Sequence, residues 1–300
     1  MSHFPVLVVT DRPDEGAIEQ ALIPFQEHAC TGKCPKEYMT FNDTEAEYLD
    51  EYQTKSRKMF RNPAGELFSP YDDKFRVPNK PGTFDSKYET PDGWTEVEVP
   101  FKQLHSTFEQ FMREWTGSDE RDPETGRFGY WENPNKKWDW WAIGGRWKHE
   151  LAYRNGKGSR PADQARVGDL DFEHIRLMRA GRALQSWDEA QADRAKMEAT
   201  DKMTAEQMDG QIEFVYGIKP GSTRDDYIAQ CSKFSLHGVL MDGKWYERGQ
   251  MGWWGIVSFE DGTAEQSNAS THRDEWQTKF DELLHSLDPN KYVTVVDCHT

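Results

Sequence analysis

The sequence predicts an α+β fold with a mixed, largely antiparallel sheet, packed amphipathic helices and one long projecting helix. Three observations lead to this prediction. Short valine-rich runs near both ends of the chain are typical of buried strands. Residues 101–115 carry an apolar stripe at helical spacing, and residues 171–208 are almost entirely helix-forming. Strands interleaved with packed helices favour the α+β class.

The first hundred residues contain one strand, two helices and a loop-rich insertion. Residues 4–9 predict the strand, and residues 14–26 predict a helix that Pro24 ends early. Residues 45–60 form a second candidate helix that is polar on most sides. Prolines, glycines and charged residues dominate 62–93, which indicates a long loop or insertion. We expect 1–300 to be a single domain that carries such insertions.

The middle of the chain is predicted to form a helix followed by a hairpin. Apolar residues recur at spacings of three and four through 101–115, and Gly117 provides a C-terminal stop. Residues 138–153 then predict a β-hairpin whose turn lies at 143–146, where glycine permits a positive φ.

A long helical excursion over 171–208 follows, with Asp171 as its expected N-cap. Its thin apolar stripe favours contact with another chain or self-association into a homo-oligomer. The remaining elements are predicted strands, a final helix from Thr271 to Leu287 and a last strand that we expect to share a sheet with the first. The strands are expected at 212–218, 234–241, 244–247, 254–259 and 292–296, and Asp242-Gly243 is expected to form a hairpin turn between two of them.

The composition restricts the classes of partner. The chain has 300 residues, 53 acidic against 37 basic, and a formal net charge of −16. Direct nucleic-acid binding is disfavoured because it depends on cationic side chains that release counterions from phosphates. A protein with a basic surface is the better-matched partner, although solubility alone also accounts for such a charge. No apolar run approaches the roughly 18 residues of a membrane span, so no membrane contact is predicted.

The tryptophan-rich segment W-D-W-W-A-I-G-G-R-W at 138–147 has two interpretations. Alternating side chains would bury tryptophans on both faces of a central strand, which is the structural interpretation. In the functional interpretation, an aromatic wall and an arginine bind a planar anion such as a nucleotide. The ligand-binding residues would then be Trp138, Trp140, Trp141, Gly144, Gly145, Arg146 and Trp147.

Cysteines and histidines near both ends of the chain are candidate zinc ligands. Zinc prefers four such groups in a tetrahedron, and neighbouring terminal strands would bring the two ends together. The C-x3-C spacing is loose for a zinc ribbon, so ordinary reduced cysteines are the alternative interpretation, and we predict no cofactor. The candidate ligands are His28, Cys30, Cys34, Cys298 and His299.

The order of several motifs resembles a family of phage-encoded proteins that are mostly without a functional name. These motifs are F-x-V-L-V-V, W-D-W-W-x-I-G-G-R-W, D-Q-A-R-x-G-D-L-D-F, W-Y-E-R-G-x-M-G-W-W-G and a terminal T-V-V-D-C-H. The resemblance covers most of the chain and implies a bacteriophage accessory protein that acts in the host cytoplasm. It assigns no catalytic residue.

The sequence therefore favours a non-enzymatic role, because it contains no nucleophile elbow, H-E-x-x-H helix or S-x-x-K motif. Our first hypothesis is an acidic counter-defence inhibitor that binds a host protein, such as a nuclease or another nucleic-acid-binding defence protein. The anti-Gabija type is one such class, reached by analogy. The alternative hypothesis is a nucleotide-binding or nucleotide-processing protein that uses the Trp-rich Gly-Gly-Arg hairpin.

Overall fold

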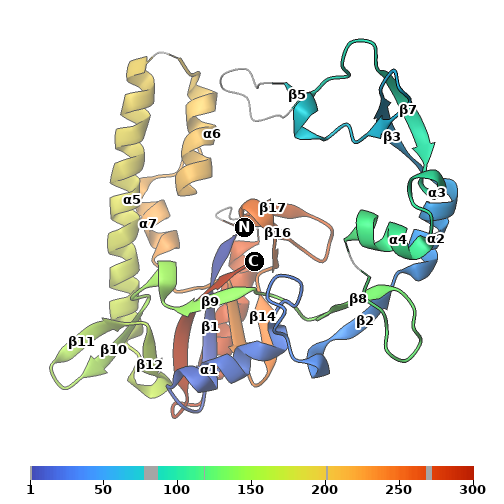
Figure 1. Ribbon diagram of the computed structural model, residues 1–300. Helices are drawn as coiled ribbons and strands as arrows, with labels where there is room; N and C mark the ends of the chain where they lie inside the picture. The colour runs from blue at the N-terminus through green and yellow to red at the C-terminus, as the bar shows by residue number, and fades with distance from the viewer. Residues whose placement is uncertain (1, 78–86, 118, 201, 268–271) are drawn as a thin grey trace. The chain divides into compact units, whose positions relative to one another are not determined.

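The computed structural model describes residues 2–77, 87–117, 119–200, 202–267 and 272–300, and the fold is α+β with mostly antiparallel sheets (Figure 1). The chain divides into two compact units. Residues 1–39 and 133–300 form the first, here called the terminal unit, and residues 40–132 form the inserted unit. The predicted insertion at 62–93 lies within the inserted unit.

The main sheet of the terminal unit joins the two ends of the chain. Strand β1 (His3–Thr10) pairs antiparallel with β18 (Tyr292–His299) along its whole length and parallel with β13 (Gly238–Met241). The prediction that the first and last strands share a sheet is therefore confirmed. Both strands are rich in β-branched residues and almost fully buried, as expected for the centre of a sheet covered on two faces.

Three further strands complete this sheet. Strand β14 (Lys244–Glu247) follows β13 through a tight turn in which Asp242 and Gly243 both have positive φ, 51° and 72°. This is the predicted Asp-Gly hairpin. On the other side of the sheet, β12 (Gln164–Arg166) pairs with the first half of β18, and β9 (Trp140–Ile143) pairs with its second half.

Each face of the sheet is covered by a helix. Helix α8 (Arg273–His285) buries Trp276, Phe280 and Leu283 in one core with Leu7 and Val295. On the other face, α1 (Glu15–Leu22) packs into a second core with Phe4, Val6 and Val8. As predicted, α1 ends where a short 3-10 turn containing Pro24 begins, because proline cannot continue the hydrogen-bond ladder. The predicted start of α8, Thr271, lies outside the described residues.

The long helical excursion is two helices rather than one. Helix α5 (Phe172–Thr200) is followed by α6 (Ala205–Tyr216) and α7 (Arg224–Cys231), which lie beside it in Figure 1. Thr204 and Gln207 form a capping box at the start of α6, and Gly217 ends it in the left-handed conformation. The prediction of a strand at 212–218 is therefore wrong, because most of these residues lie in α6. Asp171 does cap α5, since its carboxylate accepts a hydrogen bond from the His174 backbone at 3.1 Å.

The hairpin predicted at 138–153 is also wrong. Strand β9 pairs with β18, a 3-10 turn follows at Gly145–Trp147, and β10 (Leu151–Asn155) pairs instead with β11 (Gly158–Ala162). A small three-stranded sheet completes the terminal unit and consists of β15 (Gln250–Met251), β16 (Ile256–Ser258) and β17 (Ala264–Gln266).

The inserted unit contains short sheets and helices. The segment predicted as one helix at 45–60 is a helix, α2 (Glu45–Thr54), followed by a strand, β3 (Ser56–Arg61). Strand β3 pairs with β4 (Leu67–Phe68) and β7 (Thr95–Pro100). Two more pairs are β2 (Thr40–Asp43) with β8 (Gly129–Glu132) and β5 (Arg76–Val77) with β6 (Lys87–Tyr88).

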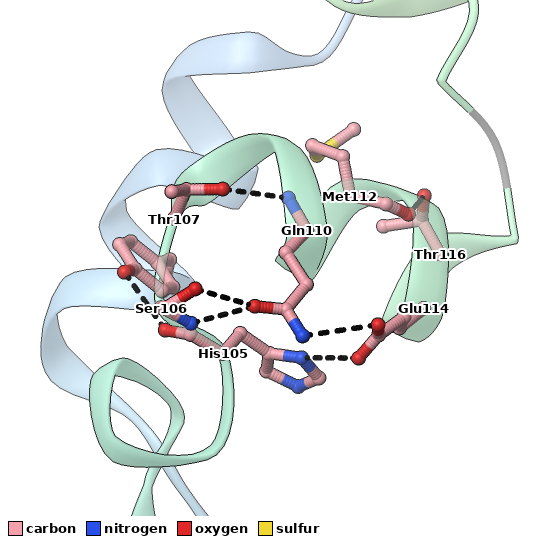
Figure 2. A network of polar contacts seen from close by, with 8 residues as sticks. His105, Ser106, Thr107, Gln110, Met112, Glu114 and Thr116 are labelled. Carbon is pink, nitrogen blue, oxygen red and sulfur yellow. Dashed lines mark hydrogen bonds and ion pairs between the residues drawn. The ribbon is translucent and has the colours of Figure 1, made fainter.

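The predicted helix at 101–115 is interrupted. Helix α3 (Phe101–Leu104) ends at His105, and α4 (Phe108–Phe111) then continues into a π-helical turn at Met112–Thr116 that Gly117 ends as predicted. Figure 2 shows the cause, which is a network of side chains that caps the new helix start. The Thr107 hydroxyl accepts a hydrogen bond from the Gln110 backbone at 3.1 Å. Nδ1 of His105 in turn lies 3.1 Å from a carboxylate oxygen of Glu114, so this buried histidine has a hydrogen-bond partner within the network.

Within the described residues, none of the helices combines the length and the apolar character that a membrane crossing requires.

Candidate functional site

Two histidines and a tryptophan lie side by side across three strands. In the register of the main sheet, His299 of β18 is opposite His3 of β1 on one side and Trp140 of β9 on the other. Directly opposite residues share one face of a sheet, so the three rings form a row on the same face. The ring centroids of His3 and His299 are 4.8 Å apart, and those of His3 and Trp140 are 6.0 Å apart.

A carboxylate holds each histidine. Nδ1 of His3 lies 2.9 Å from Oδ1 of Asp297, and Nδ1 of His299 lies 2.5 Å from Oδ1 of Asp139. Asp297 is only 1% exposed, and it also accepts a hydrogen bond from the Arg146 backbone N–H at 3.0 Å. Among the residues that the structure describes, the hydrogen bonds of both rings use Nδ1 alone, so the Nε2 atoms are not engaged.

The loop after α1 brings a thiol to this row. The backbone N–H of Glu27 donates to the Trp138 carbonyl at 2.7 Å, and the Thr31 hydroxyl donates to the Glu27 carbonyl at 2.6 Å. These bonds fix the loop beside β9. One ligand atom from each of Glu27, Cys30 and Asp139 lies within 4.8 Å of the other two.

The row and the loop together border an open hollow of about 450 Å³, here called the terminal histidine hollow. Trp140 stands at its wall with 51% of its surface exposed. The local field is negative, since Glu27 is the largest cause of the raised pKa of the Cys30 thiol, followed by partial burial. Lys136 acts in the opposite direction and more weakly. The lining residues are His3, Cys30, Thr31, Asp139, Trp140 and His299.

The four predicted tryptophans have different surroundings. Trp138 is buried, and its indole N–H donates to the Leu22 carbonyl at 3.0 Å. Trp141 packs against the same core as Trp138, whereas Trp147 packs against the core on the other face of the sheet. Only Trp140 reaches the terminal histidine hollow. The segment is thus mainly structural, with one ring available to a ligand.

The paired glycines are required by packing. Both have positive φ, 68° at Gly144 and 50° at Gly145. A Cβ on Gly144 would lie 2.8 Å from Cγ of Asp163, and a Cβ on Gly145 would lie 2.3 Å from Oδ2 of Asp297. The adjacent backbone therefore contacts carboxylates, which would repel the planar anion of the functional interpretation. The Arg146 side chain is exposed.

The five candidate zinc ligands do not form one site. Cys298 is fully buried in the core shared with Phe4, while His299, one residue further on, lines the terminal histidine hollow. Successive residues of a strand point to opposite faces, so these two side chains cannot bind one ion. Cys34 is buried and lies 3.6 Å from the amide nitrogen of Asn133. His28 is half-buried, and its Nδ1 has no hydrogen bond within the described chain.

Sequence reasoning thus found Cys30, Trp140 and His299, but it missed His3, Asp139, Asp297 and Glu27. A usable signal was present for one of them, Asp297. If the terminal strands are neighbours, alternation places Asp297 and His299 on one face of the last strand, and the sequence D-C-H already shows that spacing. No local pattern marks Glu27 or His3.

A second feature is a pair of adjacent tryptophans on the surface. Trp253 is 70% exposed and Trp254 is 80% exposed, and they lie in a 3-10 turn that ends at Gly255. Trp254 has φ 62° and ψ 22°, a left-handed conformation that is costly for a bulky side chain. The Ser2 hydroxyl fixes the turn by donating to the Gly252 carbonyl at 2.6 Å and accepting from the Gly255 backbone at 2.8 Å. We call these residues the exposed tryptophan pair.

A third feature is a basic hollow of about 350 Å³ next to the core of α8. Arg179 at its wall bonds Glu150 at 2.6 Å through Nη1, while its Nε is buried without a hydrogen-bond partner among the described residues. Burial lowers the pKa of this guanidinium, which Glu150 opposes. The arginine, lysine, histidine and large aromatic side chains in the lining are His3, Phe4, Trp147, Arg179, Lys233, His237, Arg248, Arg273 and Trp276.

Comparisons with models of protein families, with curated proteins and with solved structures gave no match. The fold and the sites therefore define the protein only as an α+β protein with a histidine–carboxylate hollow, an exposed tryptophan pair and a basic hollow.

Proposed function

We propose that the protein is a phage accessory protein that binds a basic surface of a host protein, with the exposed tryptophan pair as its anchor. The observation that carries this proposal is the exposure of two adjacent indoles, 70% and 80%, on a turn that is fixed at both ends. Tryptophan is enriched among the residues that contribute most to protein–protein binding, because its large rigid ring loses little conformational entropy.

The backbone of Trp254 supports the same proposal. A non-glycine residue in the left-handed region costs about 1–2 kcal/mol, and the turn would be relaxed by glycine at that position. The indole at 80% exposure gains little from burial in its own chain. Such strain persists mainly where it serves a function, and presenting a ring to a partner is one such function.

Charge indicates the chemistry of the partner. The net charge of −16 favours association with a basic surface and repels nucleic acid. Glu260 and Asp261 are exposed in the turn between β16 and β17, in the same small sheet that follows the tryptophan pair. A nuclease holds the phosphates of its substrate with cationic side chains, so its binding surface has this basic character. Blocking a defence nuclease in the host cytoplasm, for example one of the Gabija type, is the role reached by analogy with other phage accessory proteins.

The test compares three tagged forms recovered from infected cells: the wild type, the double variant Trp253→Ala/Trp254→Ala and the control Tyr71→Ala. Tyr71 is a matched control because its aromatic ring is also 70% exposed, but it lies in the inserted unit. We expect a stoichiometric host protein of basic charge with the wild type and the control, and at least a tenfold loss with the double variant. The complex should also weaken as salt concentration rises. Equal recovery with all three forms would contradict the proposal.

The basic hollow favours a second candidate function, which is binding of a small anionic ligand such as a nucleotide. Trp147 belongs to the predicted ligand-binding set and lines this hollow, where basic side chains converge in an otherwise acidic protein. Aromatic and cationic groups suit a planar anion through stacking and charge-assisted hydrogen bonds.

Calorimetry with nucleoside mono-, di- and triphosphates tests this second function. We expect binding to the wild type and about a tenfold loss or more with Lys233→Ala, since Lys233 lines the hollow. Lys157→Ala, in the turn between β10 and β11, is the control and should bind as the wild type does. Absence of measurable binding to the wild type would end this candidate.

A further inference from the structure

We propose that Glu27, Cys30 and Asp139 bind a borderline-soft divalent cation of the zinc type at the edge of the terminal histidine hollow. One ligand atom from each of the three residues already lies within 4.8 Å of the other two. This inference is independent of the docking proposal, because the hollow and the exposed tryptophan pair are formed by different residues.

The donor set selects the class of cation. A thiolate combined with two carboxylates suits zinc and similar ions, whereas magnesium and calcium prefer oxygen donors alone. Three protein ligands at an open hollow also leave a coordination position for water, as in zinc sites that carry out chemistry.

The charges around Cys30 favour a role as a ligand of a cation over a role as a nucleophile. Reactive cysteines lie in electropositive surroundings that stabilise the thiolate. At Cys30 the surroundings are of the opposite sign, because a carboxylate oxygen of Glu27 and one of Asp139 each lie within 4.8 Å of the thiol sulfur. A bound dication would offset these charges and release the thiol proton to solvent.

The histidines provide the support that metal ligands usually have. His299 bonds Asp139 at 2.5 Å and so orients the carboxylate, as neighbouring groups do around ligands in metal sites. His299 is packed edge-to-face against His3, which Asp297 holds from the interior of the sheet. Three segments of the chain therefore meet behind the proposed site: the two terminal strands and β9.

The test is a titration of the full chain, freed of metal by chelation, with Co²⁺ and with Zn²⁺ alone. Co²⁺ reports thiolate ligation through a sulfur-to-metal charge-transfer band. We expect one equivalent of Co²⁺ per chain with this band in the wild type. Cys30→Ser should abolish the band and lower affinity at least tenfold. Cys231→Ser is the matched control, because Cys231 is a free cysteine in α7. This variant should keep the charge-transfer band and the wild-type affinity for Co²⁺.

Two further variants separate ligands from supporting residues. Asp139→Asn should lower affinity with the band retained at saturation. His299→Gln should retain the band and lower affinity about 10- to 100-fold, as expected for a residue that only orients a ligand. Far-ultraviolet circular dichroism checks that each variant is folded. If Cys30→Ser departs from the wild-type spectrum, Asp139→Asn provides the same test with the thiol intact.

Three results would overturn the inference. The first is absence of Co²⁺ and Zn²⁺ binding by the wild type. The second is a charge-transfer band that persists in Cys30→Ser. The third is equal affinity in the wild type, Cys30→Ser and Asp139→Asn, which would indicate adventitious binding to the acidic surface only.

Discussion

The glycine pair at 144–145 shows how a single buried carboxylate determines the residues around it. Asp297 is buried and accepts hydrogen bonds from His3 and from the Arg146 backbone, and Gly145 leaves the space in which it lies. The sequence indicated a turn at these glycines but not its cause. Arg146 and Asp297 are 151 positions apart in the chain, and no local pattern reports a contact of that range.

Gly145→Ala tests this arrangement. The added Cβ would lie 2.3 Å from the Asp297 carboxylate, which overpacks the site. The backbone φ of 50° at this position is also strained for alanine. We expect the free energy of unfolding to fall by about 3 kcal/mol, measured by urea denaturation. Gly156→Ala is the control, because its Cβ would have no atom within 4 Å, and it should change stability by less than about 0.5 kcal/mol. If both variants lost a similar amount of unfolding free energy, the contact with Asp297 would not be the reason that position 145 requires glycine.

At the scale of elements, the sequence predicted best where hydrophobic pattern and turn chemistry agree. The two terminal strands, the Asp242-Gly243 hairpin and the end of α1 at Pro24 were all predicted and are all present. In each case a local signal coincides with the tertiary structure. Strand pairing at the termini followed from their shared apolar, β-branched character.

The predictions that were wrong involve side chains that compete with a regular pattern. The stripe at 101–115 has helical spacing, but Thr107 and Ser106 bond Gln110 and start a new helix there (Figure 2). Residues 212–218 contain apolar residues at a spacing that fits either a strand or a helix, and the Thr204 capping box decides for the helix. The expected hairpin after Trp138 failed because β9 finds its partner in β18.

At the scale of the whole molecule, composition predicted the acidic character, and the α+β class was also predicted. The division into two compact units was not, because sequence alone does not show that 1–39 and 133–300 fold together. The candidate sites were found in part. Cys30, Trp140 and His299 were among the predicted residues, but His3, Glu27 and both carboxylates that hold the histidines depend on long-range pairing.

Stability against acid should depend on His237, which is buried with its Nε2 3.0 Å from the Gly249 carbonyl. Burial lowers its pKa from 6.5 to about 4. The folded state therefore holds this ring neutral, while the unfolded chain takes up a proton as the pH falls below 6.5. The stabilisation is complete above pH 6.5 and is lost as the pH falls towards 4, by up to about 3 kcal/mol.

Urea denaturation at pH 7.5 and pH 4.5 of the wild type and His237→Gln checks this expectation. The carboxylates contribute an acid dependence that both proteins share, so the difference between them isolates His237. We expect the wild type to lose more stability than the variant over this range. Equal losses would mean that His237 is protonated in the folded state.

Contact between the exposed tryptophan pair and a basic host protein can be tested in infected cells. The most direct measurement is cross-linking in infected cells from a photoreactive phenylalanine analogue placed at position 254, with position 71 as the reference. We expect a cross-link to one host protein from position 254 and not from position 71, and we expect it to weaken when the salt concentration is raised before irradiation. Absence of a cross-link from position 254, or a cross-link only to a second copy of the same chain, would contradict it.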